Sequence, residues 1–229
     1  MKIGILETGR PPEQLAPQYG DYPSMFARLL ADDDFEFESF AALDGELPEN
    51  PKACDGYVIT GSKFGVYEDH PWIGKLEEFL RQAYAEGVPI VGICFGHQIL
   101  AQALGGKVEK YSGGWDVGKT AYRIENAEGG EDELKMHAWH QDQVTELPEG
   151  ARVIGSTPFC KYAALAYDNK ALTIQPHPEF AEGYVRDLIE SRRDVLPAEI
   201  TERGLSSLGG DVDAAAFAKR IKDFLKAPR

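Results

Sequence analysis

The sequence predicts an α/β fold with a mostly parallel central sheet. In the first hundred or so residues, apolar runs of strand length alternate with segments of helical periodicity. β-branched residues enrich several of these runs, and glycine or proline separates them from the helical segments. Strands that alternate with helices make crossover connections, which place parallel strands side by side beneath helices on both faces.

Each expected element follows from its own pattern. In the first half, strands are expected at residues 2–7, 35–40, 56–61 and 88–94, and helices at 22–31, at 73–85 and directly after Cys94. Residues 9–20, rich in proline and glycine, are expected to form a long loop. Short extended segments over 107–175, helices at 184–194 and 214–225, and a looser stretch at 195–210 complete the chain. Because no repeat or linker is visible, residues 1–229 are expected to form a single domain with extra C-terminal helices at about 181–229.

Composition narrows the class of protein. The chain carries 24 basic and 38 acidic side chains, and its formal net charge of -14 repels phosphate backbones and anionic lipids, so neither nucleic acid nor a membrane is an expected partner. The N-terminal apolar run is too short for a secretory signal, and the three cysteines form no CxxC pair. We therefore expect a cytoplasmic protein without disulfides. No cofactor motif is evident, and no cofactor is expected.

Cys94 is the candidate nucleophile. The sequence Gly92-Ile93-Cys94-Phe95-Gly96 lies where an expected strand gives way to a helix, the setting of a nucleophile elbow with cysteine in place of serine. The glycines remove side chains that would collide in so sharp a turn. The helix N-terminus favours a thiolate, and the N–H of Phe95 can donate to an oxyanion. The alternative is a small buried cysteine that ends a core strand, but the two glycines favour the nucleophile.

His177 is the candidate base, because it follows the strand-like run 171–175 and lies between two prolines. Pro178 biases His177 toward an extended conformation, in which Glu179 lies on the same side and can accept a hydrogen bond from the imidazole. The sequence thus predicts a Cys94-His177-Glu179 triad. The alternative is a surface histidine at a strand end, next to a solvated glutamate.

The remaining histidines fit structural roles better. His97 lies one turn into the helix after Cys94, where a packing or surface role is expected. His137 and His140 could form a metal pair with Asp142, but their segment shows no clear helical pattern, and no metal site is predicted there. The other two cysteines lack the flanking glycines of Cys94 and are interpreted as structural.

Three motifs occur together: GICFGHQ at 92–98, QPHPEF at 175–180 and TGS at 60–62. Jointly they resemble the class I (triad-type) glutamine amidotransferase family, in particular the glutaminase domain of GMP synthase and free-standing relatives that include γ-glutamyl peptidases. The resemblance runs from the first expected strand to Glu179. It implies a flavodoxin-like three-layer fold with a mostly parallel sheet, a γ-glutamyl thioester on Cys94, and release of ammonia or an amine.

The resemblance also implies which residues contact the substrate. Gly61 would be the second oxyanion donor through its N–H, although many relatives carry two adjacent glycines where this chain has Thr60-Gly61-Ser62. Gln98 would line the glutamine pocket. One segment would help to hold the amino-acid end of the substrate: Trp139, His140, Gln141 and Asp142. The plainer alternatives are a turn glycine, a polar helix residue and a core aromatic residue.

Three functions stay open. The first is a glutaminase that cleaves the γ-amide of glutamine and serves a separate synthetase subunit or an unknown acceptor, since the residues after Glu179 are too few for a synthetase domain. The second is a γ-glutamyl peptidase or hydrolase that acts on glutathione-like substrates or γ-glutamyl amines. The third is a catalytically silent binding or regulatory subunit on the same fold.

Overall fold

The computed structural model describes residues 1–228. Its main sheet has nine strands in the order β2-β1-β3-β4-β11-β10-β9-β6-β7, and β5 pairs with β8 in a second, antiparallel sheet. In chain order the strands are β1 (Lys2–Leu6), β2 (Glu36–Phe40), β3 (Gly56–Ile59), β4 (Ile90–Ile93), β5 (Lys107–Lys110), β6 (Asp116–Glu125), β7 (Glu131–His140), β8 (Asp142–Glu146), β9 (Arg152–Ser156), β10 (Ala164–Tyr167) and β11 (Ala171–Ile174).

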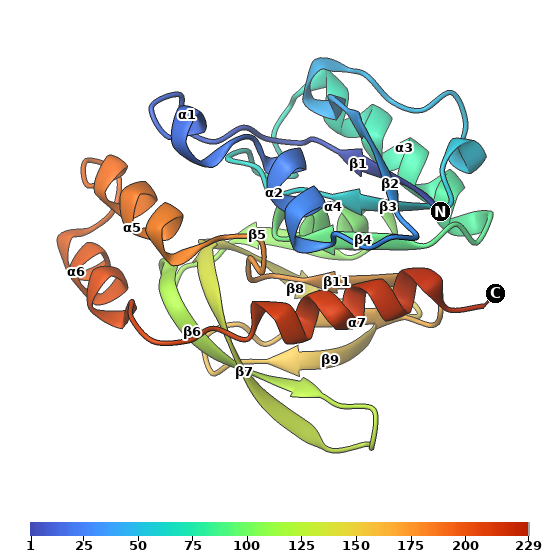
Figure 1. The fold of residues 1–229 in the computed structure, drawn as a ribbon. Coiled ribbons are helices and arrows are strands. Elements are labelled where there is room, and N and C mark those ends of the chain that lie inside the picture. Colours follow the sequence, from blue (N-terminus) through green and yellow to red (C-terminus); the bar gives the residue numbers. More distant parts are fainter. Residues whose placement is uncertain (229) are drawn as a thin grey trace.

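Two halves of the main sheet differ in direction. The strands β2, β1, β3, β4 and β11 pair in parallel, whereas β10, β9, β6 and β7 extend the sheet antiparallel. β3, β4 and β11 are buried along their whole length, as strands covered on both faces are. The β6–β7 hairpin projects away from the body of the molecule (Figure 1). The expected α/β fold with a parallel core is confirmed.

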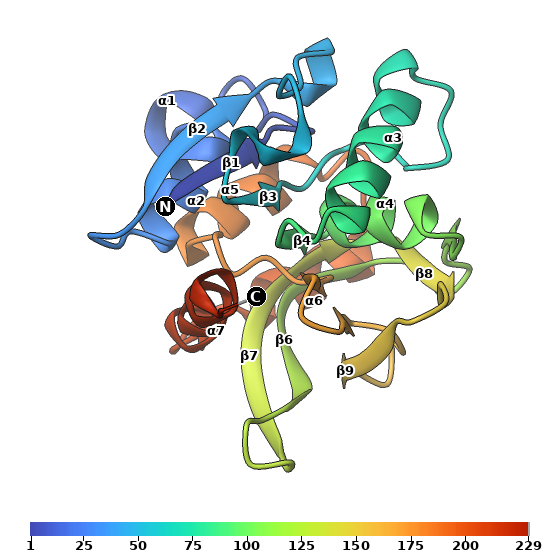
Figure 2. The ribbon, with the colours of Figure 1, turned by 90° about the vertical axis from the view of Figure 1, so that its right-hand side faces the viewer.

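Helices cover both faces of the parallel strands. They are α1 (Ala16–Tyr19), α2 (Tyr22–Leu29), α3 (Pro71–Ala85), α4 (Phe95–Ala103), α5 (Glu182–Ser191), α6 (Ala198–Ser207) and α7 (Ala214–Lys226), with short 3-10 turns at Ala42–Asp44 and Pro51–Ala53. α3 and α4 lie on one face, while α2 and α7 lie on the other (Figure 2). Accordingly Leu76 of α3 belongs to one apolar cluster, and Phe26 of α2 and Ile221 of α7 belong to another.

Three local expectations were wrong. The expected loop 9–20 contains the one-turn helix α1, and the strand expected to reach Gly61 ends at Ile59. The stretch 195–210, expected to be looser, contains α6. This helix packs closely on β6: a Cβ at Gly204 would lie only 3.0 Å from Cγ1 of Val117. Close approach to a strand is the reason for that glycine, and the sequence pattern alone does not reveal it.

Among residues 1–228, no helix combines the length and the apolar character needed to cross a membrane.

Candidate active site

The predicted site residues lie at the carboxyl ends of three adjacent parallel strands. β3, β4 and β11 pair side by side, and Gly61, Cys94 and His177 follow their ends within three residues. In open α/β sheets this edge is where ligands bind. The fold therefore brings together three residues that lie far apart in the sequence.

Cys94 occupies a strained turn between β4 and α4. Its φ of 53° and ψ of -102° lie in a region that residues with a side chain rarely adopt. The turn needs both flanking glycines, because a Cβ at Gly92 would lie 2.5 Å from the carbonyl oxygen of Gly96, and a Cβ at Gly96 would lie 2.5 Å from that of Ile59. As the first residue of α4, Phe95 has an N–H without an intrahelical partner.

His177 is fixed by contacts on several sides. Its Nδ1 lies 2.7 Å from Oε1 of Glu179, and its ring stacks on Phe180 with 4.1 Å between centroids. Its N–H donates to the carbonyl oxygen of His137 on β7, 2.8 Å away. The buried Nε2 has no hydrogen-bond partner within residues 1–228, so this nitrogen is available to a reacting group.

The surroundings of His177 favour its charged form. Burial alone lowers the pKa of the imidazole, but the Glu179 carboxylate and the Cys94 sulfur outweigh burial and raise that pKa above its usual value. The predicted contact between His177 and Glu179 is present, although for a different reason. The chain turns at Pro178 rather than staying extended, and the N–H of Phe180 donates to the carbonyl oxygen of His177 at 3.5 Å.

Gly61 packs directly against the candidate base. A Cβ on this residue would lie 2.8 Å from Cε1 of His177 and 3.8 Å from Cβ of Cys94, so only glycine fits. The hydroxyl of Thr8 donates to the carbonyl oxygens of Thr60 and Gly61, at 2.9 and 3.2 Å. Since peptide bonds are trans, holding the Thr60 carbonyl toward Thr8 turns the N–H of Gly61 away from Thr8. No sequence pattern distinguishes Thr8 beyond its place after β1.

A chain of side-chain amides leads to the sulfur. Nε2 of Gln98 donates to Oε1 of Gln175 at 3.1 Å and to the carbonyl oxygen of Asp142 at 2.8 Å. Nε2 of Gln175 in turn donates to Sγ of Cys94 at 3.5 Å. Gln98 therefore lines the site as the resemblance implied, but its Nε2 already donates two hydrogen bonds within the protein. Gln175 was missed, although it is the first residue of the QPHPEF motif.

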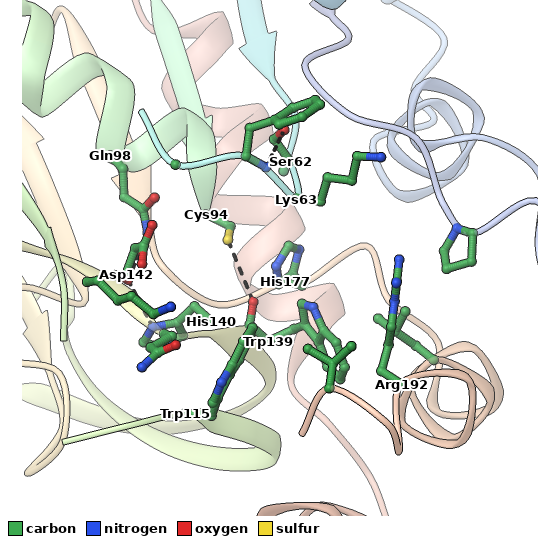
Figure 3. A pocket seen from close by; sticks show the side chains of 18 of the residues that line it. Ser62, Lys63, Cys94, Gln98, Trp115, Trp139, His140, Asp142, His177 and Arg192 are labelled. Carbon is green, nitrogen blue, oxygen red and sulfur yellow. Dashed lines mark hydrogen bonds between the residues drawn. The ribbon is translucent and has the colours of Figure 1, made fainter. Parts of the chain in front are cut away.

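The segment Trp139–Asp142 also lies at the site, where one strand ends and the next begins. Trp139 and His140 end β7, and Asp142 begins β8. The Cys94 thiol donates to the carbonyl oxygen of Trp139 at 3.9 Å (Figure 3). Burial lowers the pKa of His140 to about 3, so this residue is neutral. Nε2 of Gln141 donates to the backbone carbonyl oxygen of Tyr111 at 3.4 Å.

Several of these residues line a cavity of about 400 Å³. Cys94 and His177 lie at its centre, with Gln98 and Asp142 on one side and Lys63 and Arg192 on the other (Figure 3). Aromatic side chains add to the lining: Tyr22, Phe64, Tyr67, Trp115, Trp139 and Phe180. The volume falls in the range of pockets that bind small organic molecules.

The other candidates have structural contacts. His97 is fully buried, and its Nδ1 lies 2.8 Å from the Thr173 hydroxyl. His137 packs through Nδ1 on the carbonyl oxygen of Phe180, 2.9 Å away. Cys54 and Cys160 are buried, unpaired thiols outside the cavity. Within the described residues, no three His, Cys, Asp or Glu side chains are arranged to hold a metal ion.

Comparison with known proteins gives a consistent set of similarities. The sequence pattern of the family described as "Glutamine amidotransferase class-I" matches residues 32–189. A glutamine amidotransferase-like protein of Schizosaccharomyces pombe is 31% identical over 97% of this chain and 98% of its own length. A protein of Arabidopsis thaliana named γ-glutamyl peptidase 4 is 34% identical over 75% of this chain and 73% of its own length.

A solved structure shares the fold. The crystal structure of a glutamine amidotransferase from Methylobacillus flagellatus superposes with a TM-score of 0.75 at 22% identity, covering 98% of this chain and 92% of that one. At this level of identity the similarity concerns the fold alone.

Proposed function

Because this chain belongs to the class-I glutamine amidotransferase family, we propose that it is a cysteine hydrolase that cleaves the γ-amide bond of glutamine or a γ-glutamyl compound. One observation carries the proposal. Cys94 lies in a strained elbow next to His177, whose Nδ1 is held by Glu179 while its buried Nε2 has no partner in the described chain. A nucleophile, a base and a group that orients the base are the parts that acyl transfer needs.

The first half of the reaction forms a thioester. His177 takes the thiol proton on Nε2 and keeps it as an imidazolium, which the Glu179 carboxylate stabilises. The sulfur of Cys94 attacks the γ-carbonyl carbon, and the oxyanion accepts hydrogen bonds from the N–H groups of Phe95 and Gly61. Collapse of this intermediate expels the amine, which receives the proton from His177. Gln175, which donates to the sulfur, helps to hold Sγ in place.

The second half releases glutamate. A water molecule gives a proton to Nε2 of His177 and attacks the thioester carbon through a second tetrahedral intermediate. The same two N–H groups stabilise this oxyanion, and the proton returns from His177 to the departing thiolate of Cys94.

γ-Glutamyl peptidase activity is the second candidate. The similarity to Arabidopsis γ-glutamyl peptidase 4 spans 73% of that protein, and the family match occupies residues 32–189. A glutaminase role that serves a separate synthetase subunit or an unknown acceptor stays a prediction. We propose that residues 1–229 act as one unit in a reducing, cytoplasmic setting, in which Cys94 stays a free thiol.

Two measurements test the proposal. A diazoketone analogue of glutamine should add covalently to Cys94, and peptide mass mapping should locate the adduct there rather than on Cys54 or Cys160. The purified protein should release glutamate from glutamine or from γ-glutamyl peptides. Ammonia release that requires an added synthetase would favour the glutaminase, and unaided peptide cleavage would favour the peptidase. If neither labelling nor hydrolysis occurs, the chain is a silent subunit and the proposal fails.

A further inference from the structure

The cavity has room on both sides of the nucleophile. Gln98 and Asp142 lie on one side of Cys94, while Lys63 and Arg192 lie on the other (Figure 3). A γ-glutamyl group that bound on the Gln98 side would present its amide carbonyl to Cys94. The amine that leaves must then extend toward Lys63 and Arg192. Ammonia would leave that side of the cavity empty.

Arg192 is an unpaired cation in an acidic protein. It follows α5 directly and is half-buried, and its guanidinium makes no ion pair or hydrogen bond within residues 1–228. The next residue differs, because Arg193 pairs with Glu190 and Glu202 and does not line the cavity. In a chain with 38 acidic residues, a guanidinium left without a carboxylate at a cavity wall is suited to an anionic ligand.

An apolar wall accompanies this charge. Leu188 and Leu196 are buried at the cavity, whereas Val195 is 57% exposed and also lines it. The half-buried rings of Trp115 and Trp139 lie 5.9 Å apart on the same cavity. Apolar surface next to a free guanidinium fits a molecule that carries both a bulky apolar part and a carboxylate.

Part of this wall lies outside the region that matches the family. The family match ends at residue 189, and Arg192, Val195 and Leu196 follow it in the connection between α5 and α6. The shared region contains Cys94, His177 and Glu179. Selection of the leaving group can therefore differ among members without a change in the reacting groups.

We propose that Arg192, with the adjoining α5–α6 connection, forms a leaving-group subsite that selects γ-glutamyl compounds whose amine is an amino acid or short peptide with a bulky apolar side chain. The inference rests on the proposed cysteine-hydrolase function and names its substrate class. Arg192 binds the carboxylate of the leaving amino acid, and Val195 and Leu196 contact its side chain. Lys63 adds positive charge on the same side. Free glutamine uses none of these contacts.

A matched pair of substrates tests the subsite. γ-Glutamyl-leucine and γ-glutamyl isopentylamide have the same apolar group, but only the first carries a second carboxylate. The wild-type protein should prefer the first in kcat/KM by about tenfold to a hundredfold, the range for a charged hydrogen bond. Arg192→Ala should remove that preference by lowering kcat/KM for γ-glutamyl-leucine, while kcat/KM for the isopentylamide stays the same. Arg193→Ala, the control, should change neither value.

Binding provides a readout that does not need turnover. Calorimetry should compare the Cys94→Ala protein with the Cys94→Ala/Arg192→Ala protein. The second should bind γ-glutamyl-leucine more weakly by the same factor, and it should bind the isopentylamide with unchanged affinity. If the preference survives both Arg192→Ala and the Lys63→Ala/Arg192→Ala double variant, the subsite is refuted while the hydrolase stands. If the wild-type protein hydrolyses nothing, the proposed function fails, and the calorimetry alone decides the subsite.

Discussion

Replacing Gly61 by alanine should disable the site without unfolding the protein. The added Cβ would lie 2.8 Å from Cε1 of His177, whereas carbon contacts are most favourable at about 3.5 Å or more, so one partner must move by about 0.7 Å. Neither side yields easily, because Thr8 holds the carbonyl of Gly61 and the imidazole is fixed by Glu179 and Phe180. A displacement of this size should lower kcat/KM roughly a hundredfold and stability by about 1 to 3 kcal/mol.

Gly74 supplies the matched control. It lies in α3, and a Cβ there would meet nothing within 4 Å, so Gly74→Ala should keep full activity and gain about 0.5 to 1 kcal/mol from helix propensity. Urea unfolding gives the stability of both variants, and glutamate release from a γ-glutamyl substrate gives kcat/KM. The rate of alkylation of Cys94 by iodoacetamide reports on the thiol independently of turnover. Unchanged kinetics and alkylation in Gly61→Ala would refute the packing of Gly61 on His177.

Three further outcomes follow from the same geometry. Cys94→Ala should abolish turnover and keep the fold. In urea unfolding, Cys94→Gly should be more stable than Cys94→Ala by about 1 kcal/mol, because a φ of 53° favours glycine. Equal stability of the two variants would argue against strain at this residue. Glu179→Gln should lose less kcat than His177→Ala, since Glu179 only orients the imidazole, and the reverse order would mean that the acid is assigned wrongly. Burial raises the pKa of Asp116, and its Oδ2 has no hydrogen-bond partner within residues 1–228, so the ionised form destabilises the fold. Asp116→Asn should therefore raise the free energy of unfolding at pH 7 by about 1 to 3 kcal/mol. This gain should vanish below pH 3.8, because the carboxyl is then protonated in both the folded and the unfolded protein. A gain in stability that does not depend on pH would contradict the assignment.

Local signals in the sequence predicted how Cys94, His177 and Glu179 are placed. The elbow at Cys94 depends on glycines within two residues of it, and the contact between His177 and Glu179 spans only two positions. Such short-range geometry is encoded in a few neighbouring residues. The parallel order of the core strands was also predictable, because helices separate them in the sequence.

Long-range contacts were beyond such reasoning. Gln175 contacts a sulfur 81 positions away, and Thr8 holds a carbonyl 52 positions away. Each is an ordinary polar residue until the sheet brings the partners together. The helix α6 was missed for a related reason, since Gly204 and the serines near its end weaken the helical pattern, and packing on Val117 offsets that weakness.

The position of β11 sets an order in which activity can arise. β11 lies between β4 and β10, so the chain leaves β4, builds the antiparallel strands and then returns to the centre of the sheet. During synthesis, the chain up to Glu179 must emerge from the ribosome before His177 can reach Cys94. Through most of synthesis the thiol therefore has no base beside it. The nucleophile becomes reactive only when β11, the last strand, is inserted into the sheet.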